Sequence, residues 1–214
     1  TANSAHELRT PLATALAKLQ RLQAQTQDAH VKAQVEQIEA SLRTLSRLSE
    51  KLLELAKAEG GSALAENYND LVPILQMIAS DYEYKAPRRL KLELPASSVM
   101  SLLDPDAFAI LLRNLIENAL RHGASDQPVK ISLSAKGGLR VVNGGEVVPP
   151  DKLALLRQRF VRSDTKNLGS GIGLAIVDAI VSGAGIELNL RSPASGQSDG
   201  FEAELNIVVA RAGA

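Results

Sequence analysis

Two heptad patterns near the start of the chain constrain its fold more than any other feature. Each pattern predicts a helix that packs along one apolar seam. The first seam consists of Ala5, Leu8, Leu12, Ala15, Leu19 and Leu22, and the second begins with Val31, Val35, Ile38, Leu42 and Leu45. Residues 25–29 interrupt the pattern, so we expect an antiparallel hairpin. One hairpin cannot cover all of these leucines, so we expect a second copy to complete a four-helix bundle.

The composition excludes several classes of protein. The 214 residues are enough for one large or two modest domains. Lysine plus arginine equals aspartate plus glutamate at 24 each, which argues against a nucleic-acid partner. There is no cysteine, so disulfides and thiolate metal sites are excluded. No apolar run approaches the ~20 residues that span a bilayer.

The character of the chain changes after Gly60-Gly61-Ser62, which predicts a hinge. Beyond it the patterns predict a single mixed sheet with about three helices on one face, which is an α/β sandwich. The expected helices cover residues 71–84, 104–121, 151–159 and 172–182, and the expected strands cover 88–94, 99–103, 129–134, 139–142, 186–190 and 201–209. The predicted domains are 1–59 and 67–214, with a hinge at 60–66.

The stretch Ser4-Ala5-His6-Glu7-Leu8-Arg9-Thr10-Pro11-Leu12 carries the residues best suited to chemistry. It offers an imidazole nucleophile, a neighbouring carboxylate and a hydroxyl, and on a helix Thr10 shares a face with His6. Pro11 cannot donate a helical hydrogen bond and favours a bend. A lone histidine near a chain end is otherwise a solvated side chain, and a coiled-coil spacer would explain the seam but not this stretch.

This stretch resembles the phosphoacceptor box of the sensor histidine kinases of two-component systems. The resemblance implies that His6 takes the γ-phosphate of ATP and passes it to an aspartate of a response-regulator receiver domain. It also implies that Glu7 is the acid/base partner. Thr10 would position the water that dephosphorylates the regulator.

The helix expected after Asp104 carries a polar stripe of Asn114, Glu117, Asn118 and Arg121. Such a stripe is ordinarily a solvent face, but asparagine is a poor helix former there. An amide oxygen suits Mg²⁺, and an arginine suits phosphate. Residues 114–122 are similar to the N box of the same family. The resemblance implies that Asn118 holds Mg²⁺ with help from Asn114, and that Arg121 and His122 face the triphosphate of ATP.

Two glycine-containing stretches complete the resemblance. Asn143-Gly144-Gly145-Glu146-Val147 aligns with the family's adenine-binding loop, Asp-x-Gly-x-Gly, where Asn143 and Val147 depart from the pattern. An amide oxygen can accept from the adenine amino group, but without charge. Without the resemblance, these glycines are turn residues.

The second stretch, Gly169-Ser170-Gly171-Ile172-Gly173-Leu174, opens a helix whose N-terminus could meet phosphate. It resembles the G2 box, and residues 159–164, which include Arg162, resemble the F box. The resemblance therefore assigns Arg162, Gly169, Gly171, Gly173 and Leu174 to the nucleotide site, beside Asn143 and Gly145.

The resemblance covers nearly the whole chain and implies the Bergerat ATP-binding fold for the second domain. It implies a homodimeric kinase core that uses ATP and Mg²⁺, phosphorylates His6, serves a response regulator and dephosphorylates it. We expect the cytoplasmic portion of a bacterial inner-membrane sensor, attached to the membrane only through segments outside this chain. One alternative stays open, a nucleotide-impaired scaffold or phosphatase-biased homologue. A stand-alone ATPase of the gyrase or chaperone type does not account for the phosphoacceptor box.

Overall fold

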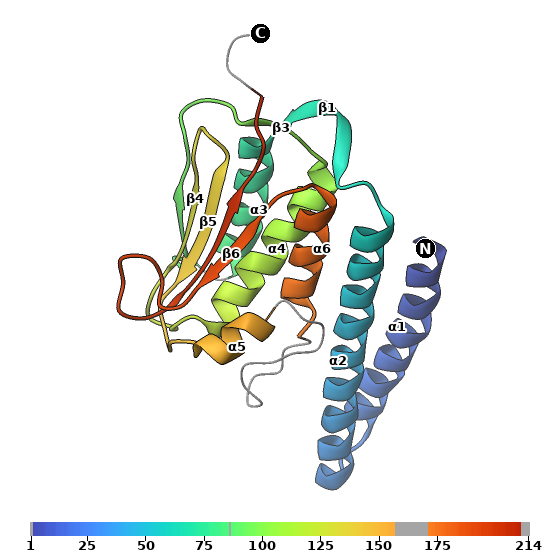
Figure 1. The fold of residues 1–214 in the computed structure, drawn as a ribbon. Helices are drawn as coiled ribbons and strands as arrows, with labels where there is room; N and C mark the ends of the chain where they lie inside the picture. The colour runs from blue at the N-terminus through green and yellow to red at the C-terminus, as the bar shows by residue number, and fades with distance from the viewer. Residues whose placement is uncertain (1, 86, 157–170, 211–214) are drawn as a thin grey trace. The chain divides into compact units, whose positions relative to one another are not determined.

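The chain divides into two compact units, Thr1–Lys57 and Ala58–Ala214 (Figure 1). The computed structural model describes residues 2–85, 87–156 and 171–210. Among the helices of these residues, none is both long and apolar enough to cross a bilayer.

The first unit is a helical hairpin, as the heptad patterns predict. Helix α1 (Ala2–Gln25) runs through Pro11 without interruption, and α2 (Ala29–Gly60) follows a short connection. Asp28 caps α2, because its Oδ1 accepts from the backbone N–H groups of His30 at 2.8 Å and Val31 at 3.4 Å. Among the side chains that the structure describes in this pair, four large apolar ones stay substantially exposed. They are Leu22, Ile38, Leu45 and Leu52.

The second unit is built on a five-stranded mixed sheet in the order β2-β4-β5-β7-β6. Its strands are β2 (Leu90–Glu93), β4 (Val129–Leu133), β5 (Gly138–Asn143), β6 (Leu188–Arg191) and β7 (Phe201–Asn206). Only β2 and β4 pair in parallel; the other three pairs are antiparallel. The mixed sheet predicted for this unit is confirmed.

Three longer helices cover one face of this sheet (Figure 1). They are α3 (Leu71–Lys85), α4 (Pro105–His122) and α6 (Gly173–Gly183), and a short helix, α5 (Pro150–Leu155), lies between β5 and α6 in the chain. The apolar stripe of α4 is buried, from Phe108 to Ala119, and inward strand residues such as Ile131 and Leu139 complete the core. The opposite face of the sheet carries the polar side chains.

The prediction of a single sheet is wrong in one respect. Strand β3 (Met100–Leu103) pairs outside the main sheet with β1 (Leu64–Asp70), a strand that the sequence patterns miss. The sequence of β1 is mostly polar and does not alternate, because its side chains are largely exposed. β1 also begins inside the residues predicted as the hinge, 60–66. The domain ranges stay predictions.

Candidate functional site

Helix α4 positions most of the predicted polar residues of the second unit. Asp104 caps its start: Oδ1 accepts from the backbone N–H groups of Asp106 at 3.0 Å and Ala107 at 2.9 Å. Pro105 occupies the first turn, where no N–H is needed. The buried apolar stripe then fixes the rotation of the helix, so that Asn118 is half-buried and Arg121 is exposed.

Asn114 lies deeper than the sequence suggested. It is 2% exposed, and its Nδ2 donates to the Ile110 carbonyl at 2.8 Å. Its Oδ1 faces α6, because a Cβ built on Gly173 would lie 3.3 Å from it. Asn114 and Gly173 therefore meet where α4 packs on the start of α6. This geometry suits a residue that supports the packing of α6 on α4. Asn118 lies one turn further along α4 and is less buried than Asn114.

The half-buried side chain of Asn118 offers an amide oxygen that would suit a magnesium ion shared with phosphate. Mg²⁺ accepts a hard amide oxygen, and it commonly takes one or two protein ligands and completes its octahedron with phosphate and water. Within the described residues no group of three or more histidine, cysteine, aspartate or glutamate side chains could hold a metal by itself. A single protein ligand such as Asn118 is therefore compatible with a nucleotide-bound ion but not with a protein-only metal centre.

The start of α6 alternates glycine with large apolar residues, in the order Gly171, Ile172, Gly173 and Leu174. Gly171 has a φ of +66°, a backbone conformation that favours glycine. Ile172 and Leu174 are buried. Ile172 occupies the N-cap position, and its apolar side chain makes no capping hydrogen bond. A helix start without such a cap can present backbone N–H groups to an anion. The predicted site residues Arg162 and Gly169 lie outside the described residues.

Asn143 ends β5 in a crowded place and is 4% exposed. A Cβ on Gly123 would lie 2.9 Å from the Asn143 Cβ, and a Cβ on Gly200 would lie 2.3 Å from the Asn143 carbonyl oxygen. Both approaches are closer than a side chain allows, so glycine is required at both positions. Sequence reasoning missed Gly123. A Cβ there would also lie 2.5 Å from the Ala119 carbonyl oxygen, so the requirement comes both from the preceding helix turn and from Asn143, twenty positions along the chain.

The side-chain amide of Asn143 has a defined orientation. Its Nδ2 donates to the Gly144 carbonyl at 3.0 Å, which leaves Oδ1 as the acceptor. Gly145 has a φ of +128°, and a Cβ there would lie 3.3 Å from the His122 carbonyl oxygen. The structure thus brings the predicted residues Asn143, Gly145 and His122 together, at the end of β5 and the end of α4.

The phosphoacceptor stretch lies on α1 in the first unit. The backbone of His6, Glu7 and Thr10 is helical, so the i, i+4 relation between His6 and Thr10 puts them on one helix face. Thr10 is exposed. The side chains of His6 and Glu7 lie outside the described part of the chain.

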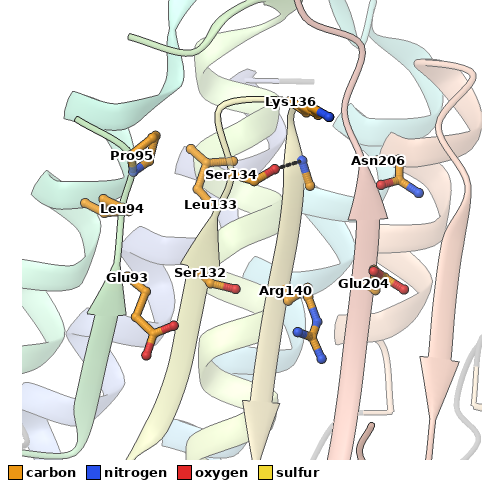
Figure 2. Close-up of a pocket in the computed structure, with 11 residues that line it drawn as sticks. Glu93, Leu94, Pro95, Ser132, Leu133, Ser134, Lys136, Arg140, Glu204 and Asn206 are labelled. Carbon is orange, nitrogen blue, oxygen red and sulfur yellow. Dashed lines mark hydrogen bonds between the residues drawn. The ribbon is translucent and has the colours of Figure 1, made fainter. Parts of the chain in front are cut away.

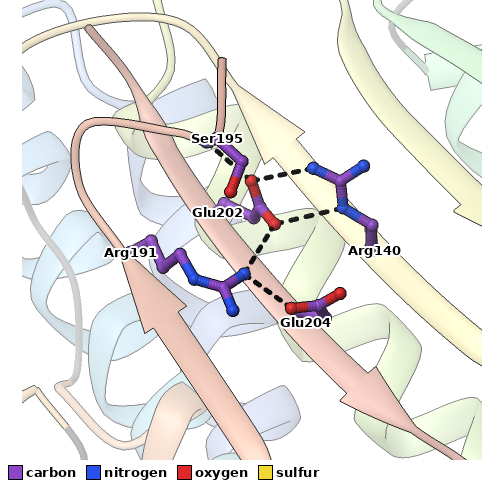
Figure 3. Close-up of polar contacts among 5 residues, drawn as sticks. All are labelled: Arg140, Arg191, Ser195, Glu202 and Glu204. Carbon is purple, nitrogen blue, oxygen red and sulfur yellow. Dashed lines mark hydrogen bonds and ion pairs between the residues drawn. The ribbon is translucent and has the colours of Figure 1, made fainter. Parts of the chain in front are cut away.

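A network of charged side chains on β5, β6 and β7 surrounds Glu202, which is fully buried (Figure 3). Arg140 donates to both carboxylate oxygens at 3.1 and 3.0 Å, Arg191 donates at 3.2 Å, and the Ser195 N–H donates at 2.9 Å. Burial by itself raises the pKa of this carboxyl group, but the hydrogen bonds from Arg140 and Ser195 outweigh burial and lower the pKa to about 2. Glu202 is therefore ionised at neutral pH.

A shallow groove of about 660 Å³ lies on the polar face of the sheet (Figure 2). Glu93, Ser132, Arg140 and Glu204 line it in one row across four strands, because they are paired in register. Three of the charged side chains that line it are already paired: Glu93 with Lys91, Arg140 with Glu202, and Glu204 with Arg191. None of the predicted site residues lines this groove, so the ends of α4 and β5 and the start of α6 remain the candidate site.

Comparison with known proteins identifies relatives of both units. Residues 1–61 match the His Kinase A (phospho-acceptor) domain, and residues 103–208 match the histidine kinase-, DNA gyrase B- and HSP90-like ATPase. The chain is 31% identical to the sensor protein QseC of Escherichia coli, in an alignment of 218 positions that covers 96% of this chain and 46% of QseC. It is 34% identical to the E. coli sensor protein BasS, in an alignment of 188 positions that covers 84% of this chain and 50% of BasS.

The fold has a counterpart among solved structures. Full-length ShkA in complex with AMPPNP superposes with a TM-score of 0.71 at 24% identity, over 100% of this chain and 46% of ShkA. This likeness concerns the fold alone. The chain spans about half the length of the relatives that it matches in sequence.

Proposed function

Because this chain belongs to the sensor histidine kinases, we propose that it is the core of such a kinase, which phosphorylates His6 from ATP and passes the phosphoryl group to a response regulator. One observation carries the proposal. Two segments of the second unit meet α4 on either side of Asn118: the glycine-rich start of α6 meets it at Asn114, and Asn143 at the end of β5 meets it at Gly123. In the proposal, Asn143 suits the adenine, the start of α6 suits the phosphates, and Asn118 suits the magnesium ion bound to them.

The nucleotide is held along these segments. Asn143 Oδ1 accepts a hydrogen bond from the adenine amino group, with Gly145 beside it. Arg121 and His122 face the triphosphate, and the backbone at Gly171, Gly173 and Leu174 approaches the phosphates. The family resemblance adds Arg162 and Gly169, which lie outside the described residues. Asn118 would hold Mg²⁺, which neutralises charge on the phosphate oxygens when it is bound.

The transfer step requires little covalent help from the protein. A ring nitrogen of His6 attacks the γ-phosphorus; an N–P bond forms, and the bond to the β,γ-bridging oxygen breaks. ADP leaves with that electron pair, and Glu7 orients the imidazole and takes up its proton. Positioning supplies most of the rate. In this proposal the second unit moves about residues 60–62.

The proposed partners follow from the first unit. A second copy of the chain covers the exposed apolar residues of α1 and α2 and makes a homodimer with a four-helix core. A receiver domain docks beside His6 and takes the phosphoryl group on its aspartate. Thr10 then positions the water that hydrolyses the aspartyl phosphate. The cytoplasmic location expected for a bacterial inner-membrane sensor stays a prediction.

One observation favours a second candidate function, a scaffold with impaired nucleotide binding or a phosphatase-biased kinase. A neutral amide, Asn143, stands where the family pattern has a carboxylate, and Val147 stands where it has glycine. A neutral acceptor makes a weaker hydrogen bond. Titration with Mg²⁺-ATP separates the two candidates, because the scaffold does not bind ATP at millimolar concentration.

Incubation with Mg²⁺ and γ-labelled ATP tests the kinase proposal, with His6→Gln as the matched control. We expect a label that is stable in base and labile in acid, as for a phosphoramidate, and that is absent from the control. A folded wild-type protein that acquires no label contradicts the kinase proposal. Label that persists in His6→Gln contradicts the assignment of His6.

A further inference from the structure

Ser192, which follows β6, joins two loops that are distant in sequence. Its hydroxyl donates to the Gly200 carbonyl at 2.6 Å and accepts from the Val148 N–H at 2.9 Å. A serine hydroxyl can be donor and acceptor at once, so both interactions coexist. Val148 is 44 residues away and belongs to the segment that begins with Asn143. We call the segments 143–148 and 192–200 the base loop and the clasp loop.

A second contact fixes the middle of the base loop. The Gly200 N–H donates to the Gly145 carbonyl at 2.8 Å, and Gly200, with a φ of +81°, lies against the Asn143 carbonyl. Ser192 therefore holds the base loop directly at Val148 and indirectly, through Gly200, at Gly145. The base loop is therefore held at two points, Gly145 and Val148, on either side of Glu146 and Val147.

The clasp loop is itself anchored to the sheet. The Ser195 N–H donates to Glu202 on β7, and Arg191, the last residue of β6, donates to the same carboxylate (Figure 3). Glu202 is buried on β7 and also accepts from Arg140 on β5. This anchor therefore joins β5, β6 and β7. A loop held in this way is a fixed support for its neighbour.

The orientation of the Asn143 side chain depends on where the base loop lies. Its Nδ2 donates to the Gly144 carbonyl, which also accepts from the Ala124 N–H at 3.0 Å. A displaced Gly144 carbonyl would release the amide to rotate, and an amide that rotates by half a turn presents a donor where it had an acceptor. A carboxylate in this place would not have that ambiguity.

We propose that Ser192 is a positioning residue for base recognition, which keeps the base loop in place so that the Asn143 amide oxygen accepts from the adenine amino group. This inference rests on the proposed ATP site. It assigns Ser192 no contact with the nucleotide. Its effect passes through Val148, Gly200 and Gly145 to Asn143.

Equilibrium binding of two nucleotides tests the inference. The probes are ATP and purine riboside triphosphate, which lacks the amino group, each with Mg²⁺ and the full chain. The proteins are wild type, Ser192→Ala, Ser192→Thr and the control Ser80→Ala, which removes an exposed hydroxyl bonded only within α3, to the Gln76 carbonyl. Circular dichroism and thermal melting verify that each variant is folded at the temperature of the titration.

We expect the wild type to prefer ATP, and Ser192→Ala to bind ATP about fivefold to tenfold more weakly, as for the loss of one hydrogen bond. Its affinity for the analogue should change much less, so that the preference falls towards one. Ser192→Thr, which keeps the hydroxyl, should restore the preference, and Ser80→Ala should retain it.

Two outcomes overturn the inference: a Ser192→Ala protein that keeps the wild-type preference, or one that loses affinity for both nucleotides by the same factor. A wild type that binds both nucleotides equally also overturns it, because Asn143 then does not read the amino group. A wild type that binds neither nucleotide contradicts the proposed ATP site itself. That outcome is distinct from a failure of the role proposed for Ser192.

Discussion

At the scale of single residues, Glu202 shows how a buried charge is stabilised by its partners. Removing one partner of such a network is costly, because the remaining charges lose their compensation. Its pKa of about 2 lies below the ordinary value of 4.5. A carboxyl group with a lowered folded-state pKa adds stability above its unfolded-state pKa and loses it as the pH falls through the folded-state value.

Glu202→Gln should therefore lower the free energy of unfolding at pH 7 by about 3 kcal/mol. The difference from the wild type should shrink as the pH falls from about 4.5 towards 2, where the wild-type carboxylate becomes protonated. Urea denaturation at several pH values measures both effects. Glu93→Gln is the control, because Glu93 is exposed and its pair with Lys91 should contribute less than about 1 kcal/mol. A pH-independent difference would contradict this account.

At the scale of elements, α2 presents apolar side chains that its own unit leaves exposed. Ile38 and Leu45 are seven residues apart, so they lie on one face, and they are 50% and 55% exposed. Contiguous exposed apolar residues on a helix are typical of an interface. The hairpin by itself therefore does not complete its core, which is the reason to expect a partner helix pair.

The double substitution Ile38→Glu with Leu45→Glu should abolish the homodimer, because two charges would be buried in the interface. Sedimentation equilibrium at micromolar concentration should then give the mass of one chain instead of two. Met77→Glu on α3, where Met77 is 56% exposed, is the matched control and should leave the mass unchanged. A monomeric wild type, or a double variant that stays dimeric, would refute the predicted interface.

At the scale of the whole molecule, the two units divide the proposed chemistry. The second unit collects the residues proposed for ATP, and the first carries His6 and Thr10 on one helix face. This division predicts that hydrolysis of the phosphorylated regulator can be lost without loss of autophosphorylation.

Thr10→Ala should slow dephosphorylation of the regulator by about 10–100-fold, since positioning of an attacking water contributes at this level. The labelling of His6 should change little, because Thr10 takes no part in that step. Release of phosphate from the labelled receiver domain and labelling by γ-labelled ATP measure the two activities. Thr44→Ala removes a similar hydroxyl, bonded to the Ala40 carbonyl on α2, and should affect neither. Equal loss of both activities in Thr10→Ala would disprove the division.

The sequence by itself determined the elements whose signals are local. Heptad spacing predicted α1 and α2, and Asp104-Pro105 with one apolar stripe predicted α4. The glycine-rich start of α6 and the order of the motifs predicted a nucleotide site, and its residues stay a prediction. Such signals can be recognised in the sequence, because a helix repeats its contacts every three to four residues and its capping residue is adjacent to it in the chain.

Tertiary structure alone decided the contacts between distant segments. It paired β1 with β3 apart from the main sheet, buried Asn114 against α6, and joined Ser192 to Val148 and Gly200. A strand has no preferred partner in its own pattern, and a hydroxyl shows no preference for one carbonyl over another. Their partners follow from how the chain folds back on itself, because hydrogen-bonding groups that become buried must be satisfied by whichever segment packs beside them.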